Sequence, residues 1–354
     1  MTPMSDLVGS GSRDRVPACN PRPNDTQSHE MEFRAPTPQR PTRPPSFSVV
    51  IPAYQSKATI GDAVASALAQ TCPPHEVIVV DDGSTDDLAG ELSPYLDRIS
   101  VIRTENGGAA SARNLGVAAA SGDFLAILDA DDVWHPRRLE ALEELAAARA
   151  DLDIISSDTW FVLDGQRVGR FYAANPFSVT DQRIAILRNC FVGCCPAVRL
   201  ARFRAIGGFD ERLRAAEDWD CWIRLILDGA TAGLVDEPLL EYRLHPGSLT
   251  SDRVRSLWDR VQVLEKTATN PSLQPAERSE LALSLLRHRT RAITAEAEAE
   301  LTRPRTRRLR LLHLAILRGV PTRTRLLVAA AAVVPRLGRR WFPRDTGASG
   351  RDSR

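Results

Sequence analysis

Two hydrophobic periods alternate along the first half of the chain, and they predict strands and helices in turn. Short β-rich or continuous apolar runs are typical of buried strands, and they occur at Phe47–Ile51, Val77–Val80, Ile99–Ile102 and Phe124–Leu128. Apolar residues recur at helical spacing over Thr59–Gln70, and Asn106-Gly107-Gly108 opens a small-residue helix through Ala119. We expect the first strand to end at Pro52, because proline cannot donate to a central ladder. The alternation indicates an α/β protein with a parallel sheet covered on both faces.

The second half has a mixed pattern that becomes helical after Ser251. Helices are predicted over Pro136–Ala150 and Glu217–Leu227, with glycine-rich loops between Cys190 and Asp210. Residues 1–45 contain nine prolines and little apolar periodicity. We therefore expect a disordered Pro-rich leader over 1–45, a catalytic domain over 46–250, a helical extension with basic amphipathic segments over 251–343, and a disordered tail over 344–354.

Composition favours an ordinary soluble protein. The 354 residues are 43% hydrophobic and 26% charged. No run approaches the roughly 18 apolar residues of a membrane-spanning helix, and no apolar signal core stands at the N-terminus. The expected location is cytoplasmic. The six cysteines show no paired CxxC spacing, so buried reduced thiols are a better interpretation than a zinc site.

Polar residues follow three of the predicted strands. They are Pro52-Ala53-Tyr54, Asp81-Asp82 and the acidic group Asp129, Asp131 and Asp132. Ligands of parallel sheets collect at the carboxyl ends of the strands. Carboxylates this close repel one another unless a cation or strong donors neutralise them, and oxygen ligands suit Mg²⁺ or Mn²⁺. The alternative is a solvated acidic turn that caps the helix near Pro136.

Two further segments could bind a ligand or take part in a reaction. The turn Asn106-Gly107-Gly108 could offer free backbone N–H groups to a phosphate, with Arg113 adding a charged contact to a diphosphate, although glycines before helices are usually only turns. Glu217-Asp218 begins a helix, where a carboxylate could complement the helix dipole or serve as general base for a hydroxyl nucleophile. His245 could be structural or functional.

Seven motifs in order resemble the inverting glycosyltransferases of family 2, which have the GT-A fold. The resemblance covers Ser46 to about Thr250. The motifs are Val49–Tyr54, Val80–Asp86, Asn106–Gly108 with Ala112–Gly116, Leu128–Asp132, Gly207–Glu211, Glu217–Asp220 and Tyr242–His245. The implied fold is a Rossmann-like mixed sheet flanked by helices, with the C-terminal helices as an extension.

The resemblance also implies roles for individual residues. Pro52, Ala53, Tyr54 and Asp82 match positions that hold the nucleotide base and ribose, and Arg113 is expected at the diphosphate. Asp129-Ala130-Asp131 matches the Asp-x-Asp motif, with Asp131 and Asp132 as ribose and metal contacts and His245 near the diphosphate as a further metal ligand. Asp218 matches the general base, and Gly207, Gly208 and Glu217 lie on the acceptor side. The implied reaction is an inverting transfer from a nucleotide-diphosphate sugar, UDP-linked before GDP- or dTDP-linked, assisted by Mg²⁺ or Mn²⁺, to a glycan or lipid-linked acceptor in cell-envelope or polysaccharide synthesis.

Other functions explain fewer of these residues. Leu128–Val133 also fits a haloacid-dehalogenase-type phosphatase with Asp129 as nucleophile. That chemistry needs a downstream lysine followed by an acidic pair, and neither Lys57 nor Lys266 supplies both. A receiver-type module would explain Asp81-Asp82 but not Asp131-Asp132 or His245. A transferase that only binds sugar gains no support, because every acidic position that the mechanism needs is present.

Charge is distributed unevenly along the chain. Residues 301–354 contain 14 arginines and two acids, a net charge of +12, whereas the preceding 300 residues have a net charge of −11. Basic amphipathic helices can lie on an anionic membrane surface. We therefore expect segment 301–343 to make peripheral contact with the inner face of the membrane, the alternative being helices that pack on the acidic catalytic domain. Nucleic acid is not expected, because aromatic residues do not interleave with the arginines.

Overall fold

The computed structural model describes residues 43–193, 195–245, 252–302, 308–317 and 321–335. The predicted tail over 344–354 and nearly all of the predicted leader over 1–45 lie outside these residues. The first half has the predicted strands and helices in order, namely β1 (Phe47–Ala53), α1 (Ile60–Leu68), β2 (Glu76–Asp81), β3 (Ser100–Arg103), α3 (Ala109–Ala119) and β4 (Phe124–Ile127). Between β2 and β3 it adds α2 (Leu88–Leu92) and η1 (Ser93–Tyr95), which the sequence analysis did not predict.

The second half of the catalytic region adds strands of both directions. Its elements are β5 (Val133–Trp134), α4 (Arg138–Ala148), β6 (Ile154–Leu163), β7 (Gln166–Arg170), α5 (Phe171–Ala174), α6 (Gln182–Arg188), β8 (Ala197–Arg199), α7 (Leu200–Ala205), α8 (Glu217–Leu227) and β9 (Ala232–Leu244). The glycine-rich region between Cys190 and Asp210 was expected to be loop, but it contains β8 and α7. A strand of three residues is too short to show a two-residue period, so its pattern could not reveal it.

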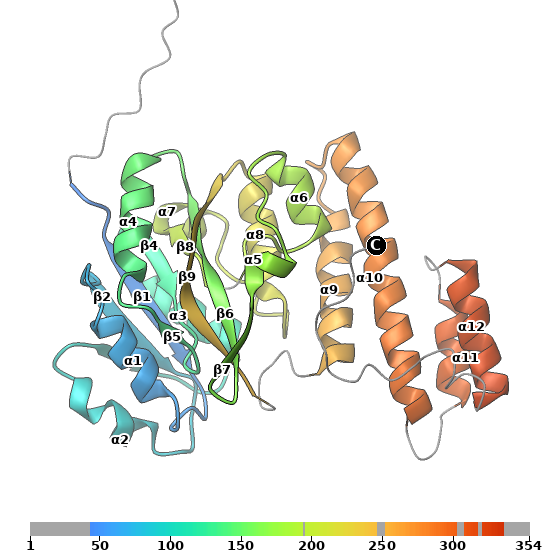
Figure 1. The fold of residues 1–354 in the computed structure, drawn as a ribbon, viewed down its shortest axis with the longest axis horizontal. Coiled ribbons are helices and arrows are strands. Elements are labelled where there is room, and N and C mark those ends of the chain that lie inside the picture. The colour runs from blue at the N-terminus through green and yellow to red at the C-terminus, as the bar shows by residue number, and fades with distance from the viewer. Residues whose placement is uncertain (1–42, 194, 246–251, 303–307, 318–320, 336–354) are drawn as a thin grey trace, which may run out of the picture. The chain divides into compact units, whose positions relative to one another are not determined.

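All of these strands form one mixed sheet, as the family resemblance implies. Its order is β3-β2-β1-β4-β8-β6-β9-β5, and β7 pairs with β6. Strands β1 to β4 are parallel, whereas β8 is antiparallel to both β4 and β6. The antiparallel β8 therefore joins the parallel half of the sheet to the half that holds β6 and β9 (Figure 1).

The first strand extends past the proline that was expected to end it. Pro52 stays in register with Val80 of β2. Its backbone faces the β4 side, because Val50, two residues earlier, accepts from Leu128 on that side at 3.0 Å. The ladder between β1 and β4 pairs no residue beyond Val50 and Ile127. Pro52 therefore breaks no strand pairing, and β1 continues to Ala53.

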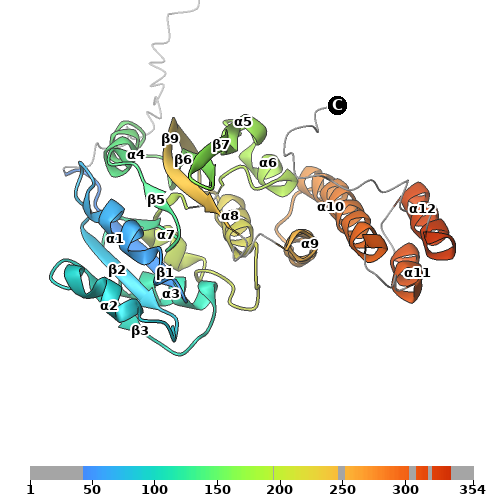
Figure 2. The same ribbon diagram turned by 60° about the horizontal axis from the view of Figure 1, so that its bottom comes forward.

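Alternate residues of the central strands enter two different cores. Val50, Ile78 and Val80 belong to one buried cluster, which also contains residues of α3 and α8. Val49 and Ile51 belong to the other, with residues of α1 and α4. The sheet is thus covered on both faces, as predicted, and Figure 2 shows α1 and α3 on opposite sides of β1 and β2.

The described residues after position 251 are mostly helical, as expected. The helices are α9 (Arg253–Ala268), α10 (Pro275–Thr302), α11 (Arg308–Ile316) and α12 (Thr322–Val333). Val263 and Leu264 of α9 and Leu281 of α10 are buried in the same cluster as Trp219 and Trp222 of α8. A separate cluster joins α10, α11 and α12.

Candidate active site

Three of the predicted site segments lie at the carboxyl ends of neighbouring strands. Strand β1 lies between β2 and β4, and all three run in the same direction. Their carboxyl ends therefore lie side by side, with Ala53, Asp81 and Asp129 at or just past them. Ala53 is buried, whereas Tyr54, the next residue, is 52% exposed and therefore accessible to a ligand.

The two aspartates after β2 have different local partners. Asp81 accepts hydrogen bonds from the Ser84 backbone N–H and from Arg103, each at 2.8 Å. Asp82 accepts from the backbone N–H groups of Gly107 and Gly108 at 2.7 and 2.8 Å. The expectation that these two amides are free for a phosphate is therefore wrong, because the Asp82 carboxylate occupies both of them.

Arg113 joins two carboxylates instead of facing outward. Its guanidinium donates to Asp129 at 2.7 Å and to Glu217 on α8 through its other terminal nitrogen. The Arg113 side chain is only 11% exposed and stacks over the Phe209 ring. Burial opposes its charge, but Asp129 and then Glu217 more than offset that effect and raise the pKa of Arg113. Both terminal nitrogens already have carboxylate partners. The expected contact of Arg113 with a diphosphate stays a prediction.

Asp218, the predicted general base, has a raised pKa. It lies in the first turn of α8, after Ala216 in the left-handed conformation with φ of 57°. Its carboxylate accepts from the Trp219 backbone N–H at 2.6 Å. Burial and then the charge of Glu217 raise the pKa of Asp218 to about 6, against the opposing effects of that hydrogen bond and of Arg113 and Arg260. A base with this pKa is ionised near neutral pH and still accepts a proton readily.

Asp131 and His245 meet although they lie far apart in the sequence. His245 Nε2 lies 2.8 Å from an oxygen of Asp131, and both side chains are partly exposed. Carboxylate oxygens suit Mg²⁺ and Mn²⁺, whereas imidazole is more typical of zinc, iron and copper sites. The structure brings two of the predicted metal ligands together, and metal binding by the pair stays a prediction.

Asp132 occupies a more enclosed position. It is 1% exposed, and its Oδ1 accepts from the Arg243 backbone N–H at 3.0 Å. Ligand atoms of Asp129, Asp132 and Cys195 lie within 4.8 Å of one another. However, Asp129 is paired with Arg113, and thiolates are poor ligands for Mg²⁺ and Mn²⁺. Metal binding by Asp132 stays a prediction, and Asp131 with His245 is the better fit.

Asn114 braces the predicted acceptor loop, a role that the sequence analysis did not assign. Its side chain donates to the Phe209 carbonyl at 3.0 Å and accepts from the Phe209 N–H at 2.9 Å. Gly208 has a φ of 74°, and a Cβ there would lie 2.6 Å from Asn114 Oδ1. Gly207 has a φ of 81° with open space around it. The sequence could have pointed to a role for Asn114, because it stands next to Arg113 in the motif Ala112–Gly116.

Comparisons with known proteins identify the family. The family Glycosyl transferase family 2 matches residues 48–207. The putative teichuronic acid biosynthesis glycosyltransferase TuaG of Bacillus subtilis (strain 168) is 34% identical, over 59% of this chain and 83% of its own length. The UDP-Glc:alpha-D-GlcNAc-diphosphoundecaprenol beta-1,3-glucosyltransferase WfgD of Escherichia coli is 29% identical, over 63% of this chain and 87% of its own.

Solved structures of similar fold cover the helical region as well. S. aureus TarS 1–349 in complex with UDP aligns with a TM-score of 0.57 and 21% identity, over 83% of this chain and 92% of its own. The mannosyltransferase PcManGT from Pyrobaculum calidifontis, in complex with GDP-Man and Mn²⁺, aligns with a TM-score of 0.55 and 20% identity, over 86% and 89%. At these identities the likeness establishes the fold alone.

Proposed function

The chain belongs to glycosyl transferase family 2 and is a glycosyltransferase, and from this premise we propose an inverting, single-displacement transfer with Asp218 as the general base. The observation that supports it most is the environment of Asp218. This carboxyl has a pKa of about 6 and follows Glu217, which Arg113 ties to Asp129 at the end of β4. The base is thus linked to the edge where a nucleotide sugar would bind.

In this mechanism Asp218 accepts the proton of the acceptor hydroxyl. The acceptor oxygen then attacks the anomeric carbon, forming the new glycosidic bond as the bond to the β-phosphate oxygen breaks. The electron pair leaves with the nucleoside diphosphate, and the configuration at the anomeric carbon inverts. Arg113 holds Asp129 and Glu217 in place, and Gly207, Gly208 and Glu217 lie on the proposed acceptor side.

Asp131 and His245 would hold a Mg²⁺ or Mn²⁺ ion next to the diphosphate. Such an ion stabilises the negative charge of the leaving group. The proposal is supported by the 2.8 Å contact between the two side chains. It is also supported by the Mn²⁺ that accompanies GDP-Man in the structure of PcManGT.

The proposed donor is a UDP-sugar, with Pro52, Ala53, Tyr54 and Asp82 at the base and ribose. WfgD is named as an enzyme that uses UDP-Glc, and TarS has been solved with UDP-GlcNAc. The proposed acceptor is a glycan or lipid-linked saccharide of cell-envelope or polysaccharide synthesis. Support for this acceptor comes from the names of TuaG, a teichuronic acid enzyme, and of WfgD, whose acceptor is a diphosphoundecaprenol.

A membrane surface would suit a lipid-linked acceptor, and α11 and α12 expose large apolar residues that could contact it. Leu309 of α11 is 84% exposed, Ile316 is 66% exposed, and Leu326 of α12 is 65% exposed. No acidic residue occurs between 301 and 343. No helix among the described residues is long and apolar enough to span a bilayer. We therefore place the contact at the surface of an anionic leaflet.

A panel of nucleotide sugars with Mn²⁺ or Mg²⁺ tests the function. Release of nucleoside diphosphate and thermal shift are measured together on the full chain. Stabilisation by one donor that requires the metal, and that is lost in Asp131→Ala, is the expected result. Phosphate release from phosphomonoesters, with no response to any nucleotide sugar, would instead favour the phosphatase alternative, in which Asp129 is the nucleophile.

A further inference from the structure

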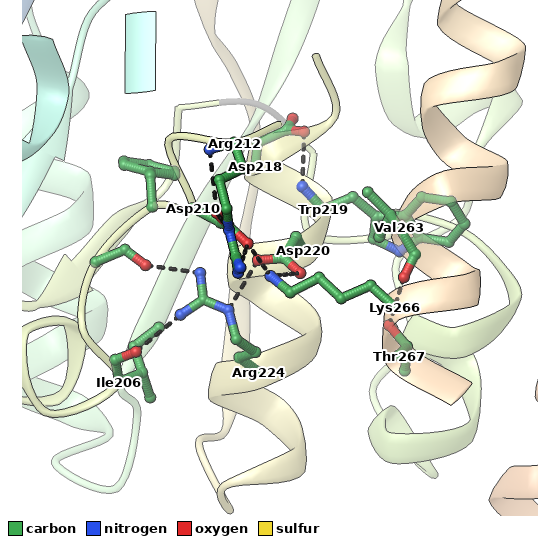
Figure 3. A network of polar contacts seen from close by, with 12 residues as sticks. Ile206, Asp210, Arg212, Asp218, Trp219, Asp220, Arg224, Val263, Lys266 and Thr267 are labelled. Atoms are coloured by element: carbon green, nitrogen blue, oxygen red, sulfur yellow. Dashed lines mark hydrogen bonds and ion pairs between the residues drawn. The ribbon is translucent and has the colours of Figure 1, made fainter. Parts of the chain in front are cut away.

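A lysine from the C-terminal helices reaches into the loop and helix that surround the proposed base. The Nζ atom of Lys266, on α9, lies 2.7 Å from Asp210 and 2.6 Å from Asp220 (Figure 3). Asp210 follows the Gly207-Gly208 loop, and Asp220 lies two residues after Asp218 on α8. Lys266 therefore ties α9 both to the proposed acceptor loop and to the helix of the general base.

Arg224 completes the network from within α8. It bonds Asp220 at 2.8 Å and donates to the backbone carbonyls of Ile206 and Gly208 at 2.9 and 2.6 Å. The Asp220 side chain is only 2% exposed, so its two oxygens are shared between Lys266 and Arg224 in a largely dry environment. Charge pairs that exclude water hold their partners in a defined geometry more strongly than surface pairs do.

The choice of lysine at this position has a chemical reason. Only Lys57 and Lys266 are lysines among the 46 basic residues of the chain. An ammonium group is a compact point charge with donors in several directions, so a single nitrogen can contact two carboxylates. Lys266 Nζ does so with Asp210 and Asp220.

We propose that Lys266 is a positioning residue for catalysis, which fixes the 207–212 loop and the first turns of α8 and so orients Asp218. The inference rests on the proposed function, because it presumes Asp218 as the base. It assigns a catalytic contribution to α9, which lies outside the segment that matches the family. Small displacements of a reacting group slow a reaction far more than they weaken substrate binding.

The test is Lys266→Met in the full chain, with the donor identified by the panel. We expect kcat to fall about tenfold or more while the donor Kd in calorimetry stays within about twofold. Each carboxylate keeps another partner, Asp210 with Arg212 and Asp220 with Arg224, so the variant is expected to fold. Lys266→Arg restores the charge and is expected to recover part of kcat.

Arg289→Met is the matched control. This variant removes the 2.7 Å ion pair between Arg289 on α10 and Glu265, which precedes Lys266 on α9. It alters no residue of α8 or of the 207–212 loop. Its kcat should equal that of the wild type. Asp210→Asn provides a second variant, because it releases the loop and leaves the buried Asp220 paired, and it should also lower kcat.

The outcomes separate the inference from the function on which it rests. Wild-type kcat in both Lys266→Met and Asp210→Asn would overturn the positioning role while leaving the transferase intact. Equal losses in Lys266→Met and in the Arg289→Met control would also overturn it, since helix packing would then be the cause. A wild-type enzyme without transfer to any acceptor, by contrast, would defeat the proposed function itself.

Discussion

Asp218 lies where its charged form is disfavoured, and the same environment would suit the general base proposed for it. Its carboxyl is partly buried and lies next to Glu217, so ionisation is unfavourable and the pKa is raised to about 6. A carboxyl with its ordinary pKa of about 3.9 would be a weaker base at neutral pH. The neighbouring Glu217 therefore contributes to the basicity of Asp218, although it is itself tied to Arg113.

The activity should follow the ionisation of Asp218. As pH rises through about 6 the carboxyl loses its proton, so kcat/KM is expected to rise over this range and level off above it. Asp218→Asn should lower transfer by about 10²-fold or more, while donor binding in calorimetry is spared. Unchanged turnover in this variant would remove Asp218 from the mechanism.

The same residue should make stability depend on pH in the opposite direction. The pKa of Asp218 is raised in the folded state, so between about pH 4 and 6 the native chain binds more protons than the unfolded chain. The free energy of unfolding therefore falls as pH rises from about 4 through 6 and levels off above that. The loss is on the order of 1 kcal/mol after allowance for the partly exposed side chain. Asp218→Asn should raise Tm at pH 7.5 and leave it nearly unchanged at pH 4. A lower Tm at pH 7.5 would contradict the raised pKa.

At the scale of elements, Arg113 is the connection between the parallel half of the sheet and α8. It extends from α3 to Asp129, just past β4, and to Glu217 at the start of α8. These side chains are poorly exposed, and a buried charge is tolerated only when its partner is in place. The guanidinium of Arg113 therefore holds the end of β4, where the donor is proposed to bind, in position relative to the start of α8, which contains the proposed base.

Removing this guanidinium should lower the free energy of unfolding by more than its two ion pairs contribute to it in the intact protein. Arg113→Met leaves two shielded carboxylates without their cation, and we expect a loss of about 3 kcal/mol in the free energy of unfolding, measured with urea. Arg113→Met combined with Glu217→Gln should recover part of that loss, because one of the stranded charges is then gone. Strictly additive losses in the double variant would show that the two residues are not coupled.

At the scale of the whole molecule, the helices of the basic C-terminal region bury some of their apolar side chains and expose others. Leu311, Leu314 and Val328 are buried against α10, and Arg310 pairs with Glu296 of that helix. Leu309, Ile316 and Leu326 stay exposed. The buried side of these helices therefore packs on α10 of the extension, and not on the catalytic domain as the alternative had it. Membrane contact by the exposed side stays a prediction.

The exposed side should determine any binding to lipid. The triple variant Leu309→Ser, Ile316→Ser and Leu326→Ser leaves the packed side intact, so it should fold, yet float less with vesicles rich in phosphatidylglycerol. A matched control is Leu163→Ser, which removes an exposed leucine from β6 far along the chain. Equal flotation of the triple variant and the wild type would disprove the proposed membrane face, as would equal binding to neutral vesicles.

Much of the fold could be predicted because its signals are local. Apolar runs of strand length and helical periods predicted β1, α1, β2, β3, α3 and β4 but not α2 or η1, and α8 has the predicted bounds, Glu217 and Leu227. The three-residue β8 was missed, as was the continuation of β1 through Pro52. Both depend on which strand lies alongside, and no property of a single segment contains that information.

The sequence by itself determined the family, the alternating elements and the set of polar residues at the strand ends, because each is encoded in a short stretch of neighbouring residues. Tertiary structure alone decided which groups meet. It gave the Gly107 and Gly108 amides to Asp82, brought His245 to Asp131, and joined Lys266 to Asp210 and Asp220. The partner of a buried charge is selected by packing and by exclusion from water, and these act across the whole chain, not along it.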